Sequence, residues 1–164
     1  MALKHYQGFI FVALPIALGL VAGFKSPALA HPGSQVPAVN AKDGVGLKGY
    51  DPVAYFLSDQ STKGLEQYNT IWKGVTYWFA STENLSRFKV DPDRYLPRYG
   101  GYCAYAMAHD QIADIDPSRW AIVNGKLYLN NGYLAQSLWS LDKSGNIQSA
   151  DRNWPGYPKE PEAK

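Results

Sequence analysis

The chain has 164 residues, of which 46% are hydrophobic, 14% aromatic and 18% charged. This length and composition suit one globular domain and exclude a disordered chain, which would hold fewer aromatic and more charged residues. Sixteen basic residues against fourteen acidic residues leave no positive excess for the backbone of a nucleic acid.

Residues 1–30 have the features of a secretory signal peptide. Lys4 precedes an uncharged apolar run over residues 8–24, and the segment ends in Ala28-Leu29-Ala30. A basic start, an apolar middle and an Ala-x-Ala exit are typical of a leader removed on export. We therefore expect a periplasmic or secreted protein, whose residues 31–164 carry no net charge and have no stable membrane association. The alternative is an uncleaved anchor, since 17 apolar residues just reach the length that spans a bilayer.

The remaining chain divides into a central domain and two flanking segments. Residues 31–39 are rich in proline and glycine and predict a flexible lead-in. Residues 156–164 combine prolines with charges and predict a disordered tail. Residues 40–155 lie between them and are enough for one modest hydrophobic core.

Two β-hairpins are predicted in this domain. Residues 68–72 and 75–79 are rich in β-branched and aromatic side chains and flank Lys73-Gly74. Residues 119–123 and 126–130 repeat the pattern around Asn124-Gly125. Asn-Gly favours a type I′ turn, because both of its central residues need positive φ.

Helical patterns fill the gaps between the hairpins. Ser81 or Thr82 is suited to cap the first helix, and Leu134, Leu138 and Leu141 share one face of the third. The predicted helices cover residues 83–90, 102–109, 132–141 and 146–154. Helices and antiparallel hairpins without βαβ order predict a small single domain of the α+β class.

Several motifs within residues 40–155 form a family pattern. They are Gly49-Tyr50-Asp51-Pro52-Val53-Ala54-Tyr55-Phe56, residues 72–81, Asp91-Pro92-Asp93-Arg94-Tyr95, Tyr99-Gly100-Gly101-Tyr102-Cys103-Ala104, Asp116-Pro117, residues 123–130 and Ala150-Asp151-Arg152-Asn153-Trp154-Pro155. Together they resemble the YHS-domain family, in its secreted stand-alone branch. The resemblance implies the fold and a link to the handling of copper and other soft metals.

The chain departs from the metal-associated members of that family at three positions. Those members place cysteines after Asp-Pro-Val, after the Tyr-x-Phe strand and one helical turn later. Here the three positions hold Ala54, Ala80 and Asn84. An alanine methyl group has no lone pair, and an amide is a poor ligand for a soft metal. We therefore expect the fold of the family without its thiolate site.

Cys103 is the only cysteine, so an intrachain disulfide and a Cys-x-x-Cys pair are both excluded. On a helix Cys103 and Met107 stack four residues apart, and two sulfur donors suit Cu(I). His109 joins them only if the helix ends there. Free cysteine is among the most buried residue types, so the simpler interpretation is that Cys103 and Met107 pack in the core.

Two further interpretations involve histidine. After cleavage at Ala30, His31 becomes the first residue, and its amine and imidazole suit Cu(II). Cys103 near a helix start is also a candidate nucleophile of a thiol-dependent enzyme, but His109 lies about 240° around an ideal helix from it. A nucleophile–base pair within one helix is therefore disfavoured.

Other candidate sites are weaker. An apolar ligand pocket is predicted near Tyr99, Tyr102 and Trp120. Asp51 and Asp116 each precede a proline and favour turn or cap roles over catalysis. The leading hypothesis is an exported binding module, without catalysis, for a metal ion such as copper or for a small ligand. The alternatives are a thiol-dependent enzyme using Cys103 and an interaction domain in which Cys103 is structural.

Overall fold

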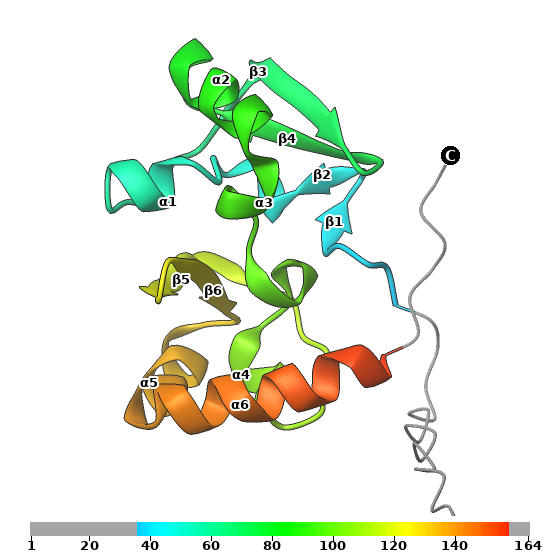
Figure 1. The fold of residues 1–164 in the computed structure, drawn as a ribbon, viewed down its shortest axis with the longest axis vertical. Helices are drawn as coiled ribbons and strands as arrows, with labels where there is room; N and C mark the ends of the chain where they lie inside the picture. Colours follow the sequence, from blue (N-terminus) through cyan, green and yellow to red (C-terminus); the bar gives the residue numbers. More distant parts are fainter. Residues whose placement is uncertain (1–35, 158–164) are drawn as a thin grey trace, which may run out of the picture.

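The computed structural model describes residues 36–157, so the predicted leader, His31 and most of the predicted tail lie outside the described residues. It has both helices and strands, which confirms the α+β class. Figure 1 shows two parts, one above the other, joined by the chain around residues 96–101. The upper part holds β1 (Ala41–Lys42), β2 (Val45–Gly46), α1 (Ala54–Leu57), β3 (Leu65–Trp72), β4 (Val75–Phe79), α2 (Thr82–Val90) and α3 (Pro92–Tyr95). The lower part holds α4 (Ala104–Ala108), β5 (Asp116–Val123), β6 (Lys126–Asn130), α5 (Tyr133–Leu141) and α6 (Lys143–Asn153).

The upper sheet has the strand order β1-β2-β4-β3. β3 and β4 form the predicted antiparallel hairpin, and Lys73 (φ 49°) and Gly74 (φ 75°) both adopt the positive φ of a type I′ turn. β3 begins earlier than expected, because a register irregularity between Leu65 and Asn69 lets the strand continue. β2 joins the sheet through a parallel pairing of Val45 with Thr76.

The lower sheet is the second predicted hairpin, β5 with β6. Asn124 (φ 51°) and Gly125 (φ 70°) form the tight turn that the sequence predicts. Along β6 the side chains alternate between two faces. Tyr128 therefore packs toward the helices below, while Leu129 packs toward the upper part of the molecule.

The predicted helices are present with shifted ends. The Ser81 side chain caps α2 by accepting a hydrogen bond from the Asn84 N–H, as the sequence predicts. α4 is shorter than expected and starts at Ala104, because Cys103 is its non-helical N-cap residue. α6 starts earlier than expected, at Lys143, because the Asp142 carboxylate accepts from the Gly145 N–H. No helix within residues 36–157 has the length and apolar character needed to cross a membrane.

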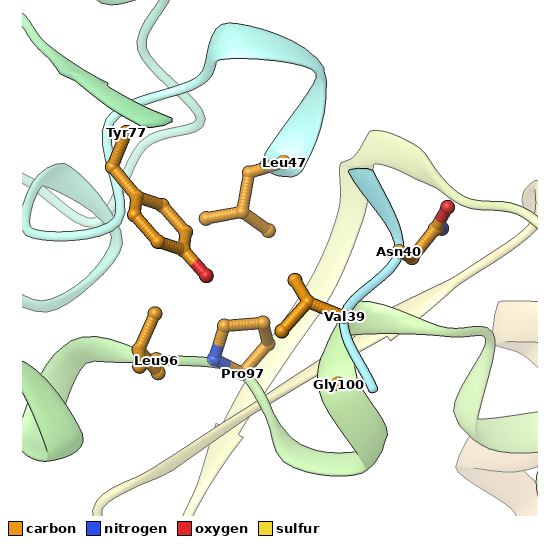
Figure 2. A pocket seen from close by; sticks show the side chains of 7 residues that line it. All are labelled: Val39, Asn40, Leu47, Tyr77, Leu96, Pro97 and Gly100. Atoms are coloured by element: carbon orange, nitrogen blue, oxygen red, sulfur yellow. The ribbon is translucent and has the colours of Figure 1, made fainter. Parts of the chain in front are cut away.

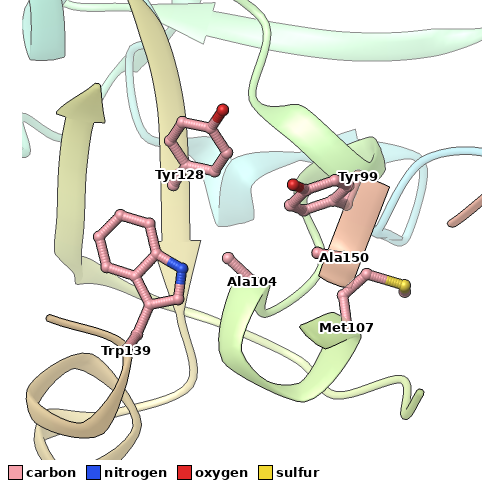
Figure 3. Close-up of a cluster of buried hydrophobic side chains, with 6 residues drawn as sticks. All are labelled: Tyr99, Ala104, Met107, Tyr128, Trp139 and Ala150. Atoms are coloured by element: carbon pink, nitrogen blue, oxygen red, sulfur yellow. The ribbon is translucent and has the colours of Figure 1, made fainter. Parts of the chain in front are cut away.

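The leucine face of α5 points outward. Leu134 and Leu141 are 70% and 83% exposed, whereas Trp139 on the other side of the helix is fully buried. Figure 3 shows Trp139 in the core cluster between the lower sheet and α4 and α6, with Tyr128, Tyr99 and Met107. The spacing of the leucines thus predicted the helix correctly. The face that packs against the core, however, is the one that carries Trp139.

The segment before β1 packs along the 3₁₀ turn Arg98–Gly101. Asn40 N–H donates to the Gly100 carbonyl at 2.8 Å, and the Tyr102 hydroxyl donates to the Pro37 carbonyl at 3.2 Å. A Cβ atom on Gly100, which has φ +60°, would lie 2.1 Å from the Ala38 carbonyl oxygen. Only glycine therefore allows the two chain segments to approach this closely.

Candidate functional site

Ala54, Ala80 and Asn84, the three positions singled out in the sequence analysis, lie around one buried carboxylate. Asp51 is fully buried, and its Oδ1 accepts hydrogen bonds from Val53 N–H at 2.8 Å and Ala54 N–H at 3.3 Å. Its Oδ2 accepts from Ala80 N–H at 2.8 Å and from Asn84 Nδ2 at 2.6 Å. Ala54, Ala80 and Asn84 therefore share one hydrogen-bond partner, the Asp51 carboxylate.

This network uses the Asp51 oxygens for structure. Four donors from three chain segments converge on the carboxylate, so the buried negative charge is compensated by hydrogen bonds. The turn role predicted for Asp51 is confirmed, and its contacts with Ala80 and Asn84 extend that role across the upper part. Among residues 36–157, no three histidine, cysteine or acidic side chains are grouped so that they would hold a metal ion.

Cys103 lies at the start of α4 and is 1% exposed. Its Sγ accepts from Asn131 N–H at 3.2 Å and from Ala106 N–H at 3.5 Å, and it lies 3.8 Å from Asn130 Oδ1, to which the thiol donates. The thiol thus fixes the end of β6 against the first turn of α4.

Met107 and His109 have different surroundings from Cys103. Met107 is fully buried in the cluster formed with Tyr99 and Trp139 (Figure 3). His109 is exposed at the end of α4, where its Nδ1 lies 2.9 Å from the Tyr105 carbonyl oxygen and its ring contacts the Tyr105 ring. The stacking predicted for Cys103 and Met107 assumes that both are helical. Cys103 is the non-helical N-cap residue of α4. Its Sγ contacts Ala106, Asn130 and Asn131, whereas Met107 packs in the cluster with Tyr99 and Trp139.

The structure does not bring together Tyr99, Tyr102 and Trp120, which the sequence placed near one pocket. Tyr99 and Tyr102 both contact Trp154. Their ring centroids lie 6.4 Å and 6.1 Å, respectively, from the centroid of the Trp154 ring. Trp120 packs against Tyr55 on the opposite face of the lower sheet, at 5.3 Å. Alternation of side chains along the β5–β6 hairpin separates the two groups.

A small cavity of about 40 Å³ lies under the segment before β1. Figure 2 shows the Tyr77 hydroxyl directed into it, between Leu47, Val39 and Pro97. Tyr77 is 2% exposed, and burial raises the pKa of its phenol well above the ordinary value. The hydroxyl is therefore neutral, and this cavity has room for little more than water.

A larger groove of about 580 Å³ lies beside the β1–β2 hairpin. Its walls come from the β1–β2 hairpin, the turn after β2, the segment just before β3, β4 and the loop before β5. They are lined by Lys42, Asp43, Val45, Lys48, Lys63, Trp78 and Asp114. Its volume lies in the range of sites for small molecules.

The groove is built around Trp78 and Lys63. The Lys63 ammonium lies 5.9 Å from the centroid of the Trp78 ring and 4.9 Å from that of Tyr50, and it donates to the Lys48 carbonyl. A Cβ atom on Gly49, at φ +75°, would lie 2.6 Å from the Trp78 ring. The glycine therefore allows the backbone to pack directly against the indole and to hold it in place.

A second cation of the groove, Lys48, is fixed by an ion pair. Its Nζ lies 2.6 Å from Asp114 Oδ2 and donates to the Ile115 carbonyl at 2.7 Å. Desolvation alone would raise the pKa of Asp114. Hydrogen bonds from Lys48, Asn40 and the Ile115 N–H outweigh it and lower that pKa below its ordinary value. Asp114 is therefore ionised at neutral pH, and it neutralises Lys48.

The sequence analysis did not find this groove. Its lysines and Trp78 are separated in sequence by 6 to 36 positions, and no local motif links them. The one local signal is Asp43-Gly44, a two-residue turn that places Lys42 at the rim.

No protein-family model, curated protein or solved structure matches this chain.

Proposed function

We propose that the protein is an exported binding module, resembling the YHS-domain family and without catalytic activity, that takes a small anionic ligand with a planar ring. The groove between Lys63 and Trp78 is the observation that carries this proposal. The N-terminal leader predicted from the sequence supports a location outside the cytoplasm.

The charge of the groove supports an anionic ligand. Three lysines and two aspartates line it, and Asp114 neutralises Lys48. Within residues 36–157, neither Lys42 nor Lys63 has a carboxylate partner. A carboxylate or phosphate entering the groove therefore meets ammonium groups that lack a counter-ion.

The aromatic wall supports a planar ring on that ligand. Trp78 is half-buried and immobilised by Gly49, so its exposed surface offers a flat contact at little entropic cost. Lys63 lies beside the indole, so one ligand can contact both side chains. Its anionic group would bind the Lys63 ammonium, and its ring would stack on Trp78.

Calorimetric titration with naphthoate and with its uncharged amide tests the proposal. We expect naphthoate to bind and the amide to bind at least about tenfold more weakly, because the amide loses the charge contact. Lys63→Gln should weaken naphthoate binding about tenfold. Trp78→Leu should weaken the binding of both naphthoate and its amide. Added salt should weaken the binding of naphthoate but not that of its uncharged amide, because salt screens the charge contact.

Lys89→Gln is the matched control, since it removes an exposed lysine of α2 outside the groove. Equal affinities for naphthoate and the amide, or equal losses in Lys63→Gln and Lys89→Gln, would contradict the proposal.

Copper at Cys103 and Met107, or at His31, stays a prediction from the sequence. The buried positions of both sulfur-bearing side chains add no observation in its favour. Metal analysis of the exported protein tests it directly, together with sequencing of its N-terminus.

A further inference from the structure

Two lysines of the groove differ in how their charge is compensated. The Lys63 ammonium has no carboxylate partner among the described residues, whereas the Lys48 ammonium lies 2.6 Å from Asp114. Across the whole groove, three lysines and two aspartates leave one positive charge uncompensated at neutral pH. The number of negative charges on a ligand is therefore a property that this groove can select.

Asp114 is held in place by hydrogen bonds that do not involve Lys48. Its Oδ1 accepts from Asn40 Nδ2 at 3.0 Å and from the Ile115 N–H at 2.7 Å, and its Oδ2 is the atom that pairs with Lys48. Lys48 in turn donates to the Ile115 carbonyl at 2.7 Å. Because the carboxylate is fixed through its other oxygen, a ligand anion that approaches Lys48 meets a fixed negative charge.

A ligand with two anionic groups is able to reach both lysines. The Lys63 ammonium donates to the backbone carbonyl of Lys48, so the two ammonium groups are separated by little more than one lysine side chain. A ring on Trp78 with one carboxylate on Lys63 would carry a second carboxylate toward Lys48. Asp114 decides whether that second contact is favourable, because its charge cancels the charge of Lys48.

We propose that Asp114 determines the charge of the ligand, so that the groove accepts an aromatic monoanion and rejects an aromatic dianion. This inference rests on the proposed function and narrows its class of ligand. Lys63 and Trp78 supply the attraction, and Asp114 supplies the repulsion that discriminates between ligands with the same ring. Asp43, which lines the groove without a cationic partner within residues 36–157, adds to this repulsion.

Calorimetric titration of the full chain with naphthoate and with naphthalenedicarboxylate, the same ring with a second carboxylate, tests the proposal. We expect the wild type to bind naphthoate at least about threefold more tightly than the dicarboxylate. Asp114→Asn should raise the affinity for the dicarboxylate at least about tenfold more than that for naphthoate. The amide keeps the Oδ1 acceptor for Asn40 and Ile115 and removes the charge opposite Lys48.

Three further variants separate the charge of Asp114 from other effects. Lys48→Gln should increase the preference for naphthoate, because it leaves the Asp114 charge uncompensated, and this measurement does not require Asp114→Asn to fold. Lys48→Gln combined with Asp114→Asn should cancel the gain in dicarboxylate binding, since the freed ammonium is its source. Asp93→Asn is the matched control, because Asp93 also faces a lysine, Lys73 at 3.6 Å, but lies outside the groove.

The outcomes distinguish this inference from the proposed function. If the wild type binds naphthoate but prefers the dicarboxylate, or if neither Asp114→Asn nor Lys48→Gln changes the preference, this inference is overturned and the proposed function stands. An equal change in Asp93→Asn and Asp114→Asn also overturns this inference alone. If the wild type binds neither compound, the proposed function fails, and this inference fails with it.

Discussion

Asp51 shows how one side chain organises the upper part of the molecule. It was predicted as a local turn former before Pro52, and two of its hydrogen bonds are local. The other two reach Ala80 and Asn84, about thirty residues away in sequence. Residue type and a following proline predict the turn, but no local pattern predicts which distant donors the second oxygen meets.

Asp51→Asn should lower the free energy of unfolding by about 3 kcal/mol. An amide can replace only one of the carboxylate oxygens, so its NH₂ group would face a donor inside the protein. Urea denaturation at neutral pH measures the change. Asp59→Asn, at an exposed loop position, is the control and should change stability by less than about 0.5 kcal/mol. Similar small effects in both variants would show that the Asp51 network contributes little.

At the scale of elements, the hairpins were the most predictable features and the helix orientations the least. Lys73-Gly74 and Asn124-Gly125 determine their own backbone geometry, so two residues are enough to predict each turn. The burial of an α5 face depends on which neighbours the fold supplies. The Trp139 and Tyr128 ring centroids lie 5.6 Å apart, whereas Leu134 and Leu141 on the other face of α5 are exposed.

Gly125→Ala should destabilise the protein by about 1 kcal/mol, because Gly125 has φ +70° and an L-residue is strained there. No atom in the described part of the chain lies within 4 Å of the added Cβ, so the expected effect comes from the backbone. Gly132→Ala is the matched control, since its Cβ is equally free and its backbone is extended. Thermal unfolding of both variants measures the difference, and equal shifts in Tm would refute the strain argument.

At the scale of the whole molecule, Asp114 connects the two parts. Its carboxylate accepts from Asn40 Nδ2 at 3.0 Å and pairs with Lys48, both in the upper part, while the loop that carries it leads into β5. One acidic residue therefore holds Lys48 of the groove and Asn40 of the segment before β1. Such long-range convergence is why the sequence predicted the class and the hairpins but not the candidate site.

The lowered pKa of Asp114 predicts a pH dependence of stability. A carboxyl group whose pKa is lower in the folded state stabilises the fold above its unfolded value, here 3.8, and that contribution disappears as the pH falls through the folded pKa. The stability difference between the wild type and Asp114→Asn should therefore be largest above about pH 5 and shrink below pH 3.8. Urea denaturation at several pH values checks this, and a difference that is constant with pH would contradict it.

The parallel pairing of β2 with β4 has a consequence for the order of folding. Three two-residue turns, at 43–44, 73–74 and 124–125, let each antiparallel pair form from neighbouring residues within microseconds. Val45 and Thr76 are thirty-one positions apart, so their pairing must wait for a much larger loop to close. The two upper hairpins thus arise independently, and the step that joins them into one sheet is also the step that brings Lys42 and Trp78 to the same groove.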